Sequence, residues 1–227
     1  MRYLACLPMY HFAQTAKSEA MFAADIAQRL SFPLRWIAPA DLDYATAELA
    51  LSMSCWGPIN AGLMPPVRIL AQLDYTGVLG GQGAYYRSAI ITRGQGRRLP
   101  PPASGPLIPR LTGRFAFNEI GSRSGLIALA EDMGLTPQSL AQTGLQTGAH
   151  LGSLRAVASG RADFAAIDCM TLHILEKFEP ACGQIDIIGW TAPRLGLPYI
   201  CNPKLPDNVA AELSSALFSL GALAAET

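Results

Sequence analysis

Two serines and a glycine stand close together in the segment 117–125, which reads FNEIGSRSG. The segment has the pattern of a strand end, a short loop and a helix that begins at Ser122 to Ser124, because apolar residues follow at helical spacing. The first N–H groups of a helix lack intrahelical partners and carry the positive end of the helix dipole. With two hydroxyls and with Gly125, which admits close approach, the segment predicts a cradle for an oxyanion such as phosphate or phosphonate. The alternative is that Ser122 or Ser124 only caps the helix.

Further along, a histidine and an aspartate also stand at predicted element ends. His150 precedes an apolar helix, where its ring can donate to an anion beside the N–H groups of that helix. The alternative is a capping or core histidine. Asp168 closes the apolar strand DFAAID, so its carboxylate is expected to be exposed at the end of that strand. It would equally serve as the N-cap of the next helix, and both roles can hold together.

The composition narrows the classes of partner. The chain has 227 residues, half of them apolar, and its 17 Lys and Arg balance its 17 Asp and Glu. Without net charge there is no field to attract nucleic acid or an anionic membrane. No apolar run suits a membrane span, so we expect no membrane insertion. The N-terminal segment MRYLACLPMYHF lacks the apolar core and cleavage site of a signal peptide, so we expect a soluble protein that stays where it is made.

Metal and disulfide chemistry are not indicated. The five cysteines have no CxxC spacing and the three histidines show no metal-binding motif, so we expect buried, reduced thiols and no metal or organic cofactor.

Strands alternate with helices along the chain, which favours an α/β fold with largely parallel sheets. The pattern predicts strands at 2–7, 33–37, 49–53, 67–73, 84–92, 114–117, 145–147, 163–167 and 185–190, and helices at 14–30, 124–133, 151–159, 170–178 and 208–224. Residues 94–109 are rich in proline and glycine and mark an excursion. We expect two lobes, residues 1–90 with 190–227 and residues 91–189, and a ligand cleft between them.

Six segments taken together resemble the phosphate, phosphite and phosphonate type of substrate-binding protein that serves ABC transporters. They are LPMY at 7–10, SCWGP at 54–58, YYRSAIITR at 85–93, FNEIGSRSG at 117–125, TGAHLGSLRAVASGRADFAAID at 147–168, and GWTAPRLGLPYI at 189–200. The resemblance covers most of the chain. It implies a type II periplasmic-binding-protein fold, in which two α/β lobes joined by two crossovers close on a ligand by a hinge. On that basis the location would be periplasmic, whereas the chain as written would be cytoplasmic.

The resemblance also implies roles for particular residues. Those that match the ligand-binding segments of the family are Ser122, Ser124, Gly125, His150, Tyr86 and Asp168. Tyr10 ends the first strand and is expected to line the cleft, and Trp56 is expected near the pocket. Strand alternation places one of Tyr85 and Tyr86 inward and the other outward, so Tyr85 is the rival of Tyr86. Asp168 would hold an ammonium group on an aminophosphonate. Trp56 stands where relatives often have a glycine, so its ring would change the size of the ligand.

We therefore expect a monomeric solute-binding protein for a small oxyanion that delivers its ligand to an ABC permease. One alternative is an enzyme on the same fold, with His150, Asp168, Cys55 and Cys169 as candidate groups. The sequence shows no recognisable set of nucleophile, base and orienting group, however. The other alternative is a ligand sensor that passes lobe closure to a partner.

Overall fold

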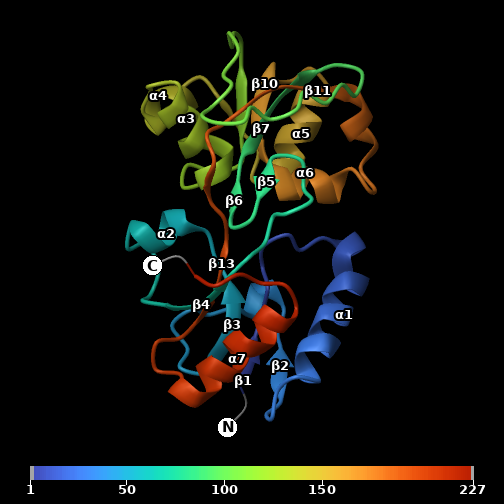
Figure 1. Cartoon of the computed structure of the whole chain (residues 1–227). Coiled ribbons are helices and arrows are strands. Elements are labelled where there is room, and N and C mark those ends of the chain that lie inside the picture. The colour runs from blue at the N-terminus through green and yellow to red at the C-terminus, as the bar shows by residue number, and fades with distance from the viewer. Residues whose placement is uncertain (1–2, 226–227) are drawn as a thin grey trace. The chain divides into compact units, whose positions relative to one another are not determined.

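The structure is a computed structural model that describes residues 3–225. The chain forms two compact units, unit 1 with residues Met1–Asp74 and Gly196–Thr227 and unit 2 with residues Tyr75–Leu195. The chain therefore leaves unit 1 once and returns to it once, and each unit has its own sheets and its own core (Figure 1).

Unit 1 is built on a five-stranded sheet with the order β2-β1-β3-β13-β4. Its strands are β1 (Tyr3–Ala5), β2 (Leu34–Trp36), β3 (Leu49–Met53), β4 (Arg68–Gln72) and β13 (Pro198–Cys201). Strand β13 is antiparallel to both of its neighbours, while β1 is parallel to β2 and β3. The carboxyl ends of β1, β2, β3 and β4 therefore lie at one edge of the sheet, where open α/β sheets bind ligands.

Three α-helices accompany this sheet: α1 (Ala16–Ala27), α2 (Trp56–Asn60) and α7 (Asp207–Ser219). Helix α7 is amphipathic, and its buried residues Val209, Leu213 and Leu217 belong to the apolar cluster that includes Ile26 of α1 and Leu51 of β3. Their spacing of four residues places them on one face of the helix. Burial of this face fixes α7 against the sheet (Figure 1).

Unit 2 contains a five-stranded sheet with the order β11-β7-β10-β8-β9 and a small sheet with the order β12-β6-β5. The strands of the large sheet are β7 (Ser88–Arg93), β8 (Phe115–Phe117), β9 (Leu145–Gln146), β10 (Phe164–Asp168) and β11 (Ile185–Trp190). Those of the small sheet are β5 (Gly81–Gln82), β6 (Tyr85–Tyr86) and β12 (Arg194–Leu195). In the large sheet, β7 is antiparallel to β10 and β11, while β8 is parallel to β9 and β10.

Short helices cover this sheet: α3 (Ala128–Asp132), α4 (Pro137–Ala141), α5 (His150–Ala158) and α6 (Cys169–Leu175). One face packs around three phenylalanines, and the ring of Phe115 lies 5.2 Å from that of Phe164 and 5.9 Å from that of Phe117. Elsewhere in unit 2, Trp190 is fully buried, and its indole N–H donates to the Leu99 carbonyl at 2.9 Å. Packing against these apolar rings accounts for the position of the helices. The hydrogen bond from the Trp190 indole to Leu99 links the proline-rich segment 94–109 to β11.

Most predicted elements are confirmed, with ends that shift by a few residues. The strand predicted at 84–92 is instead two strands, β6 and β7, separated at Arg87, whose guanidinium is buried and donates to the carbonyls of Gly105, Thr191 and Pro102. Helix α2 and strands β5, β12 and β13 were not predicted. All four lie in segments rich in glycine and proline, which are typical of turns and loops. The α/β architecture itself is confirmed, with one antiparallel strand in each five-stranded sheet.

The described residues 3–225 contain neither a helix long and apolar enough to cross a bilayer nor a group of three metal-ligating side chains. All five cysteines are free, and all but the half-buried Cys55 are buried. Burial raises the pKa of Cys6, Cys169, Cys182 and Cys201, to about 11 for the last two.

The contact between Gly80 and Trp190 yields a stability prediction. A methyl group on Gly80 would lie 2.3 Å from Cζ3 of the Trp190 ring, and the φ angle of Gly80 is +95°. Gly80→Ala should therefore lower the free energy of unfolding by about 3 kcal/mol or more in urea titrations, through overlap and backbone strain together. The matched control is Gly77→Ala, because Gly77 has φ +85° and no atom within 4 Å of its added methyl. Equal losses in the two variants would show that ring overlap contributes nothing.

Candidate functional site

The predicted helix start at Ser122 is present and has an unusual geometry. Residues Arg123–Ile127 form a π-helical turn that continues into α3, and the N–H of Ile127 donates to the Ser122 carbonyl at 3.0 Å. The Ser122 hydroxyl accepts from the N–H of Gly125 at 3.0 Å, so Ser122 is the N-cap. π-Helical segments occur mostly as single turns inside α-helices, and these turns are frequent at functional sites. The capping alternative is thus confirmed for Ser122, and its role toward a ligand stays a prediction.

Ser124 and His150 lie together although they are far apart in the sequence. The Ser124 hydroxyl and Nε2 of His150 are 2.9 Å apart, and His150 is the first residue of α5. The Ser124 carbonyl accepts from the Ser88 hydroxyl on β7 at 2.9 Å, which fixes the helix start to the sheet. Two helix N-termini, a hydroxyl and an imidazole therefore meet within unit 2.

His150 is neutral at neutral pH. Burial lowers the pKa of its imidazole to about 4, and the nearby backbone of Ala166 opposes this shift only in part. Nδ1 is buried and, among the described residues, meets no hydrogen-bond partner. A neutral imidazole has one donor and one acceptor. The group therefore offers an anion a neutral hydrogen bond rather than a positive charge.

The loop before α5 is fastened to the end of β8. The N–H groups of Thr147 and Gly148 donate to the carbonyls of Phe117 and Asn118 at 2.8 and 2.9 Å. The Thr147 hydroxyl also donates to the Phe117 carbonyl at 2.9 Å. These bonds hold the start of α5 beside the strand that leads into the serine loop. The position of His150 follows from them.

Asp168 caps a helix. Its carboxylate accepts from the N–H of Thr171 at 2.7 Å, at the start of α6, and the residue is only 4% exposed. The capping alternative is therefore confirmed, while the exposed carboxylate expected at this strand end is not found. Asp168 stands opposite Ser88 in the register of β10 and β7, which places it at the same end of the sheet as Ser124.

Between the two neighbouring tyrosines, the structure selects Tyr86 as the inward one. Tyr86 is buried and stacks on Tyr75 with ring centroids 5.5 Å apart, whereas Tyr85 is 40% exposed. The alternation of side chains along a strand accounts for the difference. A contact between Tyr86 and a ligand stays a prediction.

The two remaining predicted residues belong to unit 1. Tyr10 follows β1 with a φ angle of +62°, a conformation uncommon outside glycine, and packs against the apolar cluster of that unit. Trp56 is the first residue of α2, and its indole N–H is buried without a partner among the described residues. An unpaired buried donor is costly, so this N–H marks a place where a polar guest would be stabilising.

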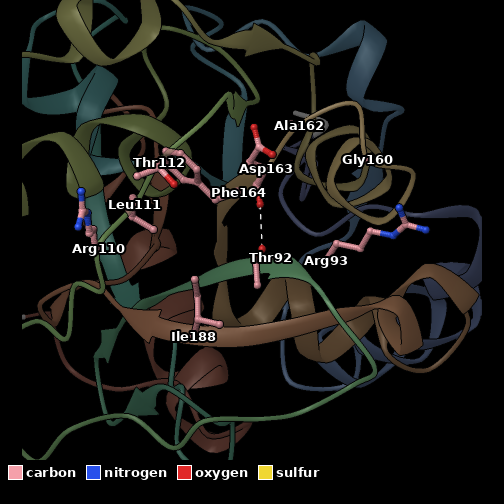
Figure 2. A pocket seen from close by; sticks show the side chains of 10 residues that line it. All are labelled: Thr92, Arg93, Arg110, Leu111, Thr112, Gly160, Ala162, Asp163, Phe164 and Ile188. Atoms are coloured by element: carbon pink, nitrogen blue, oxygen red, sulfur yellow. Dashed lines mark hydrogen bonds between the residues drawn. The ribbon is translucent and has the colours of Figure 1, made fainter.

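A pocket of about 450 Å³ in unit 2 lies elsewhere and contains none of the predicted residues (Figure 2). It surrounds the ends of β7 and β10 at which Thr92 pairs with Phe164, whereas Ser88 pairs with Asp168 at the opposite ends. The lining includes two arginines, whose guanidinium groups point away from each other (Figure 2). They do not converge on one guest, so we do not assign the anion cradle to this pocket.

Two residues of the site were missed by sequence reasoning. Ser88 fixes the Ser124 carbonyl, and Asn118 joins the serine loop to the loop before α5. The position of Asn118 at the end of a predicted strand was a usable signal, because ligands meet such ends in open sheets. For Ser88, no local pattern indicates a contact with a residue 36 positions away.

Comparison with known proteins identifies a family. Residues 64–227 match the profile of the family described as the periplasmic substrate-binding protein of phosphonate ABC transporters. No curated protein matches the chain significantly.

Solved structures share its fold. A binding-protein component of an ABC phosphonate transporter from Pseudomonas aeruginosa is 17% identical, with 96% of this chain and 72% of that chain covered and a TM-score of 0.65. PhnD1 from Prochlorococcus marinus in complex with methylphosphonate is 15% identical, with 96% and 84% covered and a TM-score of 0.66. A Xanthomonas citri protein bound to ATP is 12% identical, with 96% and 82% covered and a TM-score of 0.58. At these identities the likeness shows a type II periplasmic-binding-protein fold, which confirms the predicted fold class.

The buried imidazole predicts a pH dependence of stability. The pKa of His150 is about 4 in the folded protein, below the ordinary histidine value of 6.5, so the unfolded chain binds the proton more tightly. Stability should therefore fall as the pH drops from about 6.5 toward 4, by up to about 1.4 kcal/mol per pH unit from this residue. Urea titrations of the wild type and of His150→Gln between pH 4 and pH 8 measure the difference in slope. Parallel curves for the two proteins would exclude His150 as the source.

Proposed function

Because the chain belongs to the family of periplasmic substrate-binding proteins of phosphonate ABC transporters, we propose that it binds a small oxyanion of the phosphonate, phosphite or phosphate type and delivers it to such a transporter. The observation that carries the proposal is the hydrogen bond between Ser124 and His150, which joins two helix N-termini.

The electrostatics of this arrangement suit an anion. Oriented N–H groups, hydroxyls and a neutral imidazole supply donors, and hydrogen bonds to a charged acceptor are about twice as strong as neutral ones. Arg123 is the positively charged residue nearest to Ser124 in the sequence. Its guanidinium donates to the Glu131 carboxylate at 2.6 Å and is therefore already paired. The anion would therefore be held by dipoles at helix ends rather than by an ion pair.

A hydrolytic function is the candidate that we set aside. Ser124 and His150 form a serine–histidine pair, but a catalytic base needs a third group that orients its other ring nitrogen. Among the described residues, no carboxylate or other side chain is bonded to Nδ1 of His150, and the lowered pKa of this imidazole makes it a weak base. The thiol of Cys169 is buried with a raised pKa, which keeps it protonated. Binding without turnover fits these groups better.

The proposal is tested by calorimetric titration of the full chain with phosphate, phosphite, methylphosphonate and aminoethylphosphonate. We expect at least one of the four to bind with a dissociation constant in the micromolar range or tighter. After incubation with the protein, the ligand should have an unchanged mass, as measured by mass spectrometry. Failure of all four to bind would overturn the proposal, and release of a cleaved product would favour an enzyme.

A single hydroxyl should account for a measurable share of the affinity. Ser124→Ala removes a donor next to the charged guest and should weaken binding of the ligand found above by about 1–3 kcal/mol, as a lost hydrogen bond to a charged group does. Ser215→Ala is the matched control, because Ser215 is exposed on α7 in unit 1 and its hydroxyl donates to the Ala211 carbonyl. The dissociation constant of the control should not change. If Ser124→Ala binds as tightly as the wild type, Ser124 is not part of the site.

A further inference from the structure

Arg194, the first residue of β12, is a cation whose side chain is only 13% exposed. Its Nη2 donates to Oδ1 of Asp132 at 2.8 Å, and its Nη1 donates to Oδ2 at 3.1 Å. Nη2 also donates to the Glu131 carboxylate at 3.0 Å and to the Ala128 carbonyl at 3.1 Å, and Nη1 donates to the Ala192 carbonyl at 2.9 Å. Except for Ala192, all of these acceptors belong to α3, the helix that continues directly from the π-helical turn. The arginine therefore ties β12 to α3.

This ion pair is charged and fixed in direction. Burial alone would lower the pKa of the Arg194 guanidinium, but the hydrogen bonds to Asp132 and Glu131 outweigh burial and raise it. The guanidinium is planar, so a carboxylate that accepts from two of its nitrogens is fixed in orientation as well as in distance. The Ala192 N–H donates to the same Asp132 carboxylate at 2.7 Å. The end of α3 is therefore held in one orientation against the segment 191–195.

The segment 191–195 also holds the serine loop, through Ser88. The Thr191 N–H donates to the Ser88 carbonyl at 3.0 Å, and the Ser88 N–H donates back to the Thr191 hydroxyl at 2.8 Å. The Ser88 hydroxyl in turn donates to the Ser124 carbonyl at 2.9 Å. One short stretch of chain therefore holds the turn that carries Ser124, and it holds the following helix α3 through Arg194.

A second ion pair runs along the same helix. Arg123 directly precedes Ser124 and donates to Oε1 of Glu131 at 2.6 Å. Oε2 of the same carboxylate accepts from Arg194. Burial alone would raise the pKa of Glu131, but the hydrogen bonds from the two arginines outweigh burial and lower it, so the carboxylate is ionised at neutral pH. Glu131 therefore links Arg123 with Arg194 along the π-helical turn and α3.

We propose that Arg194 is a positioning residue of the oxyanion site, because it holds α3 where the Ser124 hydroxyl meets the imidazole of His150. The inference rests on the proposed function and adds a residue to the same site. Arg194 acts through α3, since its guanidinium donates to α3 and to Ala192. Binding groups must be held within about 0.5 Å of their working positions. A small rotation of α3 would therefore disturb the contact between Ser124 and His150.

Loss of the guanidinium would cause such a rotation. The side chain of Asp132 is only 9% exposed, and a buried carboxylate without its cation is costly. Without Arg194, the carboxylates of Asp132 and Glu131 would gain stability by turning toward water, and α3 would turn with them. Lysine would not replace the arginine, because it carries a charge without the planar set of donors.

The position of the helix start can be measured without a ligand. In NMR, the imidazole nitrogen signal of Nε2 of His150 reports on its hydrogen bond with Ser124, and His150→Gln identifies that signal. We expect the signal to shift in Arg194→Met and in Arg194→Lys. Asp132→Asn should shift it as well, because this change removes the ion pair from the other side and keeps the shape of the side chain.

Binding is measured by calorimetric titration with phosphate, phosphite, methylphosphonate and aminoethylphosphonate. We expect Arg194→Met, Arg194→Lys and Asp132→Asn to bind the anion about tenfold more weakly, the loss that corresponds to one hydrogen bond to a charged group. Arg98→Met is the matched control, and it should leave both the His150 signal and the affinity unchanged. Arg98 also pairs with a carboxylate and donates to backbone carbonyls, but these acceptors belong to Glu176, Cys182 and Ile185.

Thermal unfolding shows which variants are folded at the temperature of the titration. Folded variants in which the His150 signal shifts and the affinity falls support the inference. A folded variant that shows only one of these changes, or neither, overturns it and leaves the proposed function intact. A loss of affinity that occurs only in unfolded variants overturns it as well. A wild type that binds none of the four anions overturns the proposed function and, with it, the role of Arg194 in binding.

Discussion

The hydrogen bond between Ser124 and His150 is the contact on which the proposed site depends, because it brings two helix N-termini together without a single positive charge. Each terminus is held independently. The serine loop is fixed by the capping bond of Ser122 and by Ser88, and the start of α5 is fixed by the loop at Thr147 and Gly148. The donors are therefore arranged before any guest arrives, so binding would cost little ordering entropy.

Strand β7 organises unit 2 around that contact. Ser88 donates its hydroxyl to the Ser124 carbonyl, and its backbone N–H donates to the Thr191 hydroxyl at 2.8 Å. The adjacent Arg87 donates to the Thr191 carbonyl at 2.9 Å and to two carbonyls of the proline-rich excursion. One short stretch of chain thus connects the helix start with the segment that leads back toward unit 1. A buried guanidinium that meets carbonyls instead of a carboxylate is rigid, since each bond has a fixed direction.

Much of this architecture was predictable from the sequence, because it follows from period and spacing. The alternation of apolar strands and amphipathic helices predicted the α/β fold, and FNEIGSRSG predicted the helix start at Ser122. Local patterns failed where the deciding contact is distant. The break between β6 and β7 at Arg87 and the partners of Ser88 depend on residues tens of positions away. For Asp168 the sequence left two roles open, and the distance to Thr171 selects the cap.

The raised pKa values of the buried cysteines affect how fast the protein is oxidised in air. Oxidants attack the thiolate, and with a pKa of about 11 only about one molecule in ten thousand of Cys182 or Cys201 is ionised at pH 7. Both residues are also buried, Cys182 with 4% and Cys201 with 0% of its surface exposed. Disulfide cross-links at these buried cysteines would therefore form slowly, which leaves the half-buried Cys55 as the thiol most open to oxidants.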